Sequence, residues 1–400
     1  MSSRVVCTSG ERGQVRIALP VTEIFQREYS GLTWRKWMDV EVRLEEKLQG
    51  VLDSWREFSD CLGVNLSVLD SERGNWSLAS GFTTLRPENT MPPNAPCFIY
   101  SITKTFSAVA VLKLVEHGKL QLNEPVNNYL GYEGLEKEIK VIHLLNHTSG
   151  VPDYVALDRV QAKASQACSM PIPDDEVLRE TLVLSPKDFR PGGGWRYSNT
   201  GYMLVKKLIE QVTGQSYANA IKELLIDPLG LESTFVADGP YESTVIAGYT
   251  RRFSPIGKME DMSNRYDLGW VKTGLIVSNT SDVALFFKNV FSGKFLNDES
   301  LEQMTRIRSF EREHNGEEVQ LSYGLGIDIF TNAGGYQEFG HGGGGPGFTT
   351  GCKYYAFPDN RQIVLAAFCN TSMQGSLHFL FHEILEALWA PRTRLGLSED

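Results

Sequence analysis

The chain has 400 residues, of which 42% are hydrophobic and 22% are charged. This composition is typical of a folded globular protein, and the length is sufficient for a sizeable core divided into two lobes. The formal net charge of -10 comes from acidic and basic residues spread along the chain, without a polybasic stretch. These features exclude nucleic acid and anionic membrane surfaces as expected partners.

The first twenty residues contain no basic leader followed by an apolar stretch, and no later segment approaches eighteen uncharged apolar residues. We therefore expect a soluble, cytoplasmic protein. The cysteines lie far apart without a CxxC pair, as expected of reduced thiols that pack as small buried side chains. They are Cys7, Cys61, Cys97, Cys168, Cys352 and Cys369.

In the first third of the chain, hydrophobic spacing predicts an amphipathic helix over residues 34–55 that covers one face of a sheet. Residues 62–69 and 76–82 are predicted as two strands of a hairpin around the polar turn at 70–75. A long helix is expected to begin near Ser101 and to end at Gly118.

The middle of the chain is predicted to be mainly helical, and the last third returns to strands. The expected helices are 140–146, 200–212, 217–226 and 377–389, and the expected strands are 274–278, 323–330, 337–341, 349–357 and 362–369. This order predicts an α/β fold of the α+β type, with a mainly antiparallel sheet flanked by helices. We expect residues 1–108 and 262–400 to form one discontinuous domain, residues 109–261 to form an inserted helical domain, and the active site to lie between them.

The tetrad Ser101-Ile102-Thr103-Lys104 lies where the long helix is predicted to begin. A serine and a lysine three residues apart share one helical face, so the amine can reach the hydroxyl. The lysine can accept the serine proton only if its pKa falls well below about 10.4. The helix N-terminus, apolar neighbours and a second cation could each lower it. An isolated SxxK tetrad often arises by chance, so it is a weak signal alone.

A second element, Tyr197-Ser198-Asn199, follows a glycine-rich turn at 191–194 and precedes a predicted helix. The Tyr197 phenol can carry a proton between a serine, a lysine and a leaving group, and the Asn199 amide can hold a lysine and a substrate carbonyl. The alternative is structural, with Asn199 capping the helix and Tyr197 packed beside it.

The third element is the glycine-rich stretch from His341 to Gly347, at the end of a predicted strand. Glycines there allow a ligand to lie against the strand, and a free backbone N–H can point at a developing oxyanion. No Gly-Lys-Ser/Thr follows, so this is not a phosphate-binding loop. The alternative is a flexible turn with an incidental histidine.

In this order, the three elements resemble the S-x-x-K, Tyr-x-Asn and Lys-Thr-Gly motifs of the serine β-lactamase-like, penicillin-binding-protein superfamily. Other stretches resemble its class C β-lactamase and family VIII carboxylesterase branch. They are HLLNHTSGVPDY at 143–154, YSNTGYMLVKKLIEQVTG at 197–214, DPLGL at 227–231 and YGLG at 323–326. The resemblance extends from about residue 40 to the C-terminus.

The resemblance implies that Ser101 is acylated and that Lys104 and Tyr197 exchange its proton. Asn199 would orient the lysine and the substrate.

At the third motif, His341 stands where the superfamily often has a lysine. Gly344 would supply one N–H of the oxyanion hole, and Ser101 the other. A mostly neutral imidazole predicts weaker recognition of a substrate carboxylate, which argues against β-lactamase and carboxypeptidase activity.

Two histidine pairs, His143 with His147 and His378 with His382, are spaced four apart on predicted helices. Neither pair has an acidic third ligand at metal-site spacing. We interpret both as structural and expect chemistry without a metal or other cofactor.

The sequence predicts a serine hydrolase that cleaves an ester or amide of a small intracellular metabolite through an acyl-Ser101 intermediate. An acyltransferase or transesterase, a β-lactamase or D-amino-acid peptidase, and a ligand-sensing module without turnover remain open. The expected partner is a small-molecule ester or amide, and the expected state is a monomer or homodimer. Residues 1–35 are expected either to line the cleft or to support a dimer.

Overall fold

A computed structural model describes residues 34–164, 170–237, 244–254, 256–263, 267–314, 317–331, 335–373 and 377–389. For residues 34–42, 308–314 and 317–321 it describes the backbone alone. Two compact units are present, Met1–Glu41 and Val42–Asp400, and the architecture below is that of the larger unit. Cys7, Cys168 and the segment 1–33, for which a cleft or dimer role is expected, lie outside the described residues.

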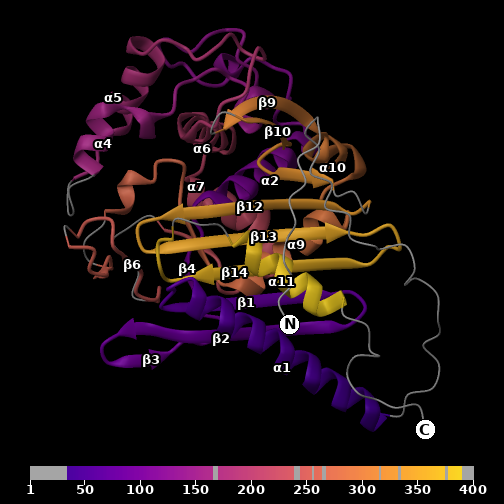
Figure 1. Cartoon of the computed structure of the whole chain (residues 1–400). Coiled ribbons are helices and arrows are strands. Elements are labelled where there is room, and N and C mark those ends of the chain that lie inside the picture. The colour runs from indigo at the N-terminus through magenta and orange to yellow at the C-terminus, as the bar shows by residue number, and fades with distance from the viewer. Residues whose placement is uncertain are drawn as a thin grey trace, which may run out of the picture. The chain divides into compact units, whose positions relative to one another are not determined.

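The centre of the larger unit is an antiparallel sheet whose described strands follow the order β3-β2-β1-β14-β13-β12-β11-β10-β9. Their bounds are β1 Gly63–Asp70, β2 Gly74–Leu85, β3 Glu88–Thr90, β9 Arg308–His314, β10 Glu317–Tyr323, β11 Asp328–Thr331, β12 Gln337–Gly345, β13 Phe348–Ala356 and β14 Gln362–Cys369. Strand β14 pairs with β1, so strands from distant parts of the chain lie side by side (Figure 1). This confirms the prediction of a mainly antiparallel sheet flanked by helices.

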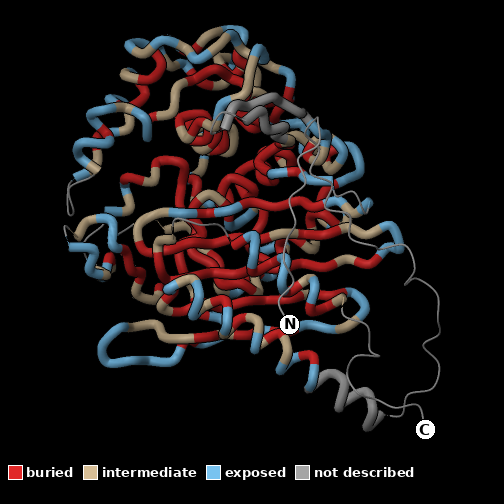
Figure 2. The backbone as a smooth tube through the Cα atoms, viewed as in Figure 1, coloured by how far each residue is buried: buried red, intermediate tan, exposed pale blue. Residues whose placement is uncertain are grey.

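Strand β14 shows why the sheet is buried on both faces. Ile363 and Leu365 pack in a core with helices α1 (Trp34–Phe58) and α11 (His378–Trp389). Val364 and Phe368 pack in a second core with α2 (Thr103–Glu116) and α9 (Thr280–Phe291). Because side chains alternate across a strand, a continuous apolar sequence serves both cores. Figure 2 shows the central strands buried and the β2–β3 hairpin tip exposed.

Helices and short strands fill the region between β4 and β8. The helices are α3 Val141–Leu145, α4 Asp158–Ala164, α5 Asp174–Arg179, α6 Asn199–Thr213, α7 Tyr217–Ile221 and α8 Asp227–Leu229, followed later by α10 Asp298–Thr305. Strands β4 (Cys97–Phe98), β5 (Phe235–Val236) and β8 (Ile276–Ser278) form one small sheet, and β6 (Tyr249–Thr250) pairs with β7 (Glu260–Asp261). None of the described helices is long and apolar enough to span a bilayer.

Three predicted elements differ from the structure. The predicted long helix opens with a 3-10 turn, Tyr100–Ile102, before α2 starts. The predicted strand 323–330 is divided, because β10 ends at Tyr323 and β11 starts at Asp328. The glycine stretch belongs to strand β12 and does not follow it. The predicted domain boundaries at 108/109 and 261/262 stay a prediction.

Candidate active site

The structure brings Ser101, Lys104 and Asn199 together at the start of α2. The Lys104 Nζ lies 3.1 Å from the Ser101 Oγ and donates a 2.8 Å hydrogen bond to the Asn199 Oδ1. Lys104 is only 1% exposed, and this desolvation lowers its pKa to about 7, against the opposing charge of Asp153. At neutral pH much of the amine is therefore unprotonated and can accept a proton from the serine hydroxyl.

Tyr197 lies beside the same lysine. The Lys104 Nζ is 5.0 Å from the centroid of the phenol ring, and a side-chain hydrogen bond links Tyr197 with Ser101. Burial raises the pKa of Tyr197 well above its usual range, although this hydrogen bond acts in the opposite direction. The phenol is thus protonated at neutral pH. The helix cap of α6 is Ser198, whose side chain accepts from the Gly201 N–H, so the capping alternative for Asn199 is wrong.

Asp153, to which the sequence pattern assigns no role, lies directly behind Asn199. Its Oδ1 accepts from the Asn199 backbone N–H at 3.1 Å, and its Oδ2 accepts from the Asn199 Nδ2 at 3.0 Å. It also caps the 3-10 turn Tyr154–Ala156 by accepting from the Val155 N–H. Burial raises the pKa of Asp153, while these hydrogen bonds act to lower it. The aspartate is part of the HTSGVPDY stretch, but only the fold shows its contact with Asn199.

His341 faces the site from β12, and both of its ring nitrogens are engaged. Its Nδ1 lies 2.6 Å from the Gly342 carbonyl oxygen, which can only accept, so the Nδ1 carries the proton. The Nε2 then accepts from the Tyr323 hydroxyl at 3.1 Å. Burial, reinforced by the charge of Lys104, lowers the pKa of His341 to about 4. The imidazole is therefore neutral at physiological pH and has no free lone pair.

The glycines of β12 allow that strand to approach the turn that holds Ser101. A Cβ on Gly343 would lie 2.2 Å from the Ile99 carbonyl oxygen, and one on Gly345 would lie 2.2 Å from the Tyr100 ring. Tyr100 itself has a φ of 45°, in the left-handed region that favours glycine. Pairing with β11 stops at Gly340, so none of the described strands pairs with Gly344 on that side of β12. A backbone N–H at this edge is available to a ligand.

A literal Lys-Thr-Gly sequence occurs at 272–274, but it does not supply the third element. Lys272 is 5% exposed, and its Nζ donates to the Asp174 Oδ1 at 2.8 Å. Gly274 packs against Tyr217, ahead of the short strand β8, and not on β12. The residue types alone do not identify the motif, because its position in the large sheet matters.

The two histidine pairs serve other contacts. His143 lies on α3, whereas His147 follows that helix with a φ of 61°, so the prediction that both lie on a helix is wrong for His147. The His147 Nδ1 accepts from the Ser198 N–H at 3.1 Å. On α11, His382 lies 3.6 Å from Glu386. Among the described residues, no group of three or more metal-ligating side chains is placed to hold a metal ion.

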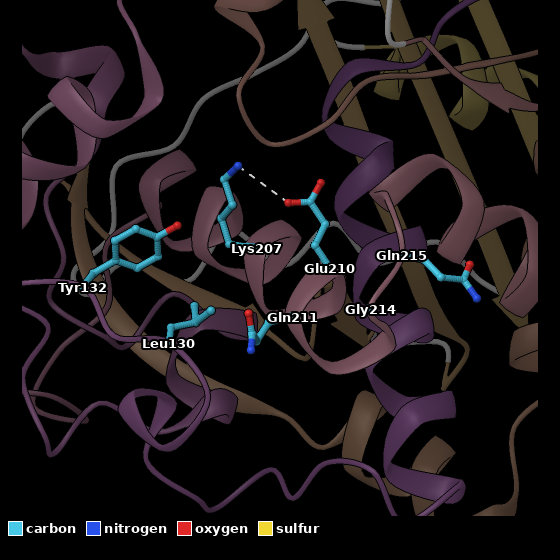
Figure 3. A pocket seen from close by; sticks show the side chains of 7 residues that line it. All are labelled: Leu130, Tyr132, Lys207, Glu210, Gln211, Gly214 and Gln215. Carbon is cyan, nitrogen blue, oxygen red and sulfur yellow. Dashed lines mark ion pairs between the residues drawn. The ribbon is translucent and has the colours of Figure 1, made fainter.

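A separate hollow of about 450 Å³ lies along α6, away from Ser101 (Figure 3). Its lining residues are Leu130, Tyr132, Lys207, Glu210, Gln211, Gly214 and Gln215. Figure 3 shows the Lys207 amine and the Glu210 carboxylate pointing toward one another, at 3.6 Å. At 1.5 Å per residue, the end of α6 lies roughly 20 Å from Asn199. Lys207 also lies 3.5 Å from Asp174, and Gln215 donates to Glu223 at 2.7 Å. These contacts do not involve the residues around Ser101.

Comparison with known proteins places this geometry in a family. Residues 53–388 match the family described as Beta-lactamase. Penicillin-binding protein 4* of Bacillus subtilis (strain 168) is 29% identical over 313 residues, which cover 72% of this chain and 64% of that protein. Esterase EstB of Burkholderia gladioli is 34% identical over 152 residues, which cover 35% of this chain and 38% of that protein. The chain thus matches less than two thirds of the length of either relative.

The fold of the chain is also similar to that of solved structures. A D-stereospecific amidohydrolase from Streptomyces sp. superposes with a TM-score of 0.70 at 26% identity, covering 86% of this chain and 98% of that chain. The D-amino acid amidase from Ochrobactrum anthropi SV3 complexed with D-phenylalanine has a TM-score of 0.72 at 23% identity over 87% and 100%, which shows a shared fold. Because the family match covers most of the sequence, the chain belongs to the Beta-lactamase family, within the serine β-lactamase-like and penicillin-binding-protein superfamily.

Proposed function

We propose that the protein is a serine hydrolase that cleaves an ester or amide of a small molecule through an acyl-Ser101 intermediate. One observation carries this proposal: the Ser101 hydroxyl lies 3.1 Å from the buried amine of Lys104, whose pKa of about 7 lets it act as a base.

In the proposed reaction, the Ser101 oxygen attacks the substrate carbonyl carbon while its proton passes to the Lys104 amine. The backbone N–H groups of Ser101 and Gly344 donate to the oxyanion that forms. Tyr197 gives its proton to the leaving alcohol or amine and recovers one from the lysine. Water then attacks the acyl group, its proton returns to the oxygen of Ser101 through the same groups, and the carboxylic acid leaves.

The contacts of His341 favour substrates without a carboxylate at this position. Its two ring nitrogens are bound to Gly342 and Tyr323, and with a pKa of about 4 it carries no positive charge. Loss of one charge-assisted contact costs about 1.5 to 3 kcal/mol, roughly ten- to a hundredfold in specificity. We therefore propose that short esters are better substrates than penicillins or D-alanyl-D-alanine peptides.

D-amino acid amides are a second candidate substrate class. The amidohydrolase from Streptomyces sp. is named as D-stereospecific, and the match covers 98% of its chain at 26% identity. A carboxamide is neutral, so it also fits a site with a neutral His341.

The thiols of the described cysteines are buried and form no disulfide, which supports our proposal of a cytoplasmic location and an intracellular substrate. They are Cys61, Cys97, Cys352 and Cys369.

The test combines covalent labelling with a substrate comparison. A fluorophosphonate probe should label Ser101 in the wild type and in Ser107→Ala, a control on the same helix, but not in Ser101→Ala. The ratio kcat/KM should be higher for p-nitrophenyl butyrate than for a chromogenic cephalosporin. Equal labelling of Ser101→Ala would contradict the assignment of Ser101 as the nucleophile. Faster hydrolysis of the cephalosporin than of the ester would identify a β-lactamase. Labelling without turnover would favour the ligand-sensing alternative, and ester formation with added alcohols would favour an acyltransferase.

A further inference from the structure

We propose that Asp153 is a positioning residue of this site: it fixes the Asn199 amide with its oxygen toward Lys104, and so keeps the lysine lone pair available to Ser101. This inference rests on the proposed function of Ser101 and Lys104. It deepens that function by naming the group that orients the base.

The orientation follows from what a carboxylate can accept. Both Asp153 oxygens face N–H groups, from the Asn199 backbone at 3.1 Å, the Asn199 Nδ2 at 3.0 Å and the Val155 backbone at 3.2 Å. An ionised carboxylate cannot donate, so the Asn199 amide must present its NH₂ group to Asp153. Its Oδ1 must then face the other way, where it accepts from the Lys104 Nζ at 2.8 Å.

The consequence concerns the base. A neutral amine has one lone pair, and with its N–H directed at the Asn199 Oδ1 that lone pair can turn to Ser101, 3.1 Å away. A flipped Asn199 would instead donate an N–H to the Lys104 Nζ. That hydrogen bond would occupy the lone pair that has to accept the serine proton.

Asp153 also supplies a negative charge one amide away from the lysine. The groups that act on Lys104 come from several elements and are Asp153, His147, His341, Tyr197 and Tyr202. Burial lowers the pKa of both histidines and raises the pKa of both tyrosines, so these groups are neutral near pH 7. The charge of Asp153 raises the pKa of Lys104 against desolvation. Loss of this charge should lower that pKa further.

The test is a charge exchange between the two side chains. In Asp153→Asn, the new side-chain NH₂ group would face the NH₂ group of Asn199, so two donors would meet without an acceptor. We therefore expect kcat to fall roughly 10- to 100-fold and the acid limb of kcat/KM to move to lower pH. In the double variant Asp153→Asn/Asn199→Asp, the hydrogen-bond pattern is restored with the carboxylate now on Lys104. Its acid limb should move above the wild-type position, and kcat should recover in part at high pH.

Asp267→Asn is the matched control, because Asp267 also caps a three-residue 3-10 turn by accepting from a backbone N–H but lies exposed. Its pH profile should equal that of the wild type. Shifts of the single and double variants in the same direction, or unchanged profiles in protein that melts as a folded domain, would overturn the role of Asp153. Failure of the proposed function is a separate result, since Ser101→Ala would then still hydrolyse the ester.

Discussion

Lys104 and Lys272 are both buried, at 1% and 5% exposure, but their surroundings differ. The Lys104 Nζ contacts the Ser101 hydroxyl and the Asn199 amide oxygen. The carboxylate of Asp153 acts on its charge, but the Asn199 amide lies between the two groups. The Lys272 Nζ contacts the Asp174 carboxylate directly at 2.8 Å, with the Gly269 carbonyl oxygen at 3.4 Å.

The difference supports the proposed role of Lys104 as a base. Desolvation favours the neutral amine, whereas a carboxylate in contact favours the ammonium. A neutral amide between the two leaves the amine free to exchange a proton, as at Lys104. Direct pairing, as at Lys272, gives a structural ion pair between the segment before β8 and α5.

Alanine substitution should separate the two lysines most strongly. We expect Lys104→Ala to lower kcat by roughly 10³-fold or more, because the serine loses its base. Lys272→Ala should change kcat by less than about threefold in protein that remains folded. Ester hydrolysis at pH 8, with circular dichroism as the folding control, measures both. Equal losses would mean that Lys104 is no more specialised than Lys272.

Tyr197→Phe should have the next largest effect, about 10²-fold in kcat, since the phenol shares the proton with Lys104. Removing both groups should cost little more than removing Lys104 alone, because they act as a unit. A double variant whose loss equals the product of the single losses would show that the two groups act independently.

These contrasts were only partly predictable from the sequence. Ser101 and Lys104 are one helical turn apart, so local geometry alone places them together. The Asp153 contact with Asn199 spans 46 residues and requires the fold. The sequence Lys-Thr-Gly at 272–274 is identical to a known motif. Only the fold shows that Lys272 forms an ion pair with Asp174, which lies 98 residues away in the sequence.

The sequence does not predict the two strands β9 and β10 at the edge of the sheet. Strands β9 and β10 include the charged sequences RSFEREH and EEVQLSY, which lack a clear apolar alternation. Strand β14, which is buried on both faces, was predicted at its correct bounds, because a continuous apolar stretch after a Pro-Asp-Asn turn is a strong signal.

The pH profile tests the proposed role of Lys104 as the base. The base form of Lys104 is lost as the pH falls through its pKa of about 7, so kcat/KM should drop about tenfold per pH unit below that value. The profile of Lys272→Ala should have the same limb. A limb near pH 4 would instead match the pKa of His341 and would assign the base to that residue.

Stability should change in opposite directions at the two sites. Burying Lys104 lowers its pKa to about 7 from 10.5, so folding is penalised whenever the unfolded chain carries this proton. Lys104→Met should therefore raise the melting temperature, more at pH 6 than at pH 9. Lys272→Met leaves the Asp174 carboxylate without this partner and should lower stability by roughly 1 to 3 kcal/mol. Thermal unfolding of both variants at the two pH values measures this, and equal signs would contradict the comparison.

The smallest expected effect is that of Asp174→Asn, and it separates the two sites by pH. Burial acts to raise the pKa of Asp174, but its hydrogen bond with Lys272 and the charges of Lys272, Lys207 and Lys206 lower it overall. A depressed carboxyl pKa contributes stability above the unfolded value near 3.8, which is lost as the pH falls through the folded pKa. The side chain is 36% exposed, so solvent screening limits this contribution to about 1 kcal/mol or less. Asp174→Asn should thus be slightly less stable than the wild type at pH 7 and should approach it below pH 4. The contribution of Lys104 to stability, by contrast, changes with pH only between about pH 7 and 10.5. A stability difference for Asp174→Asn that varied with pH in that alkaline range would therefore show that the two lysine sites are coupled.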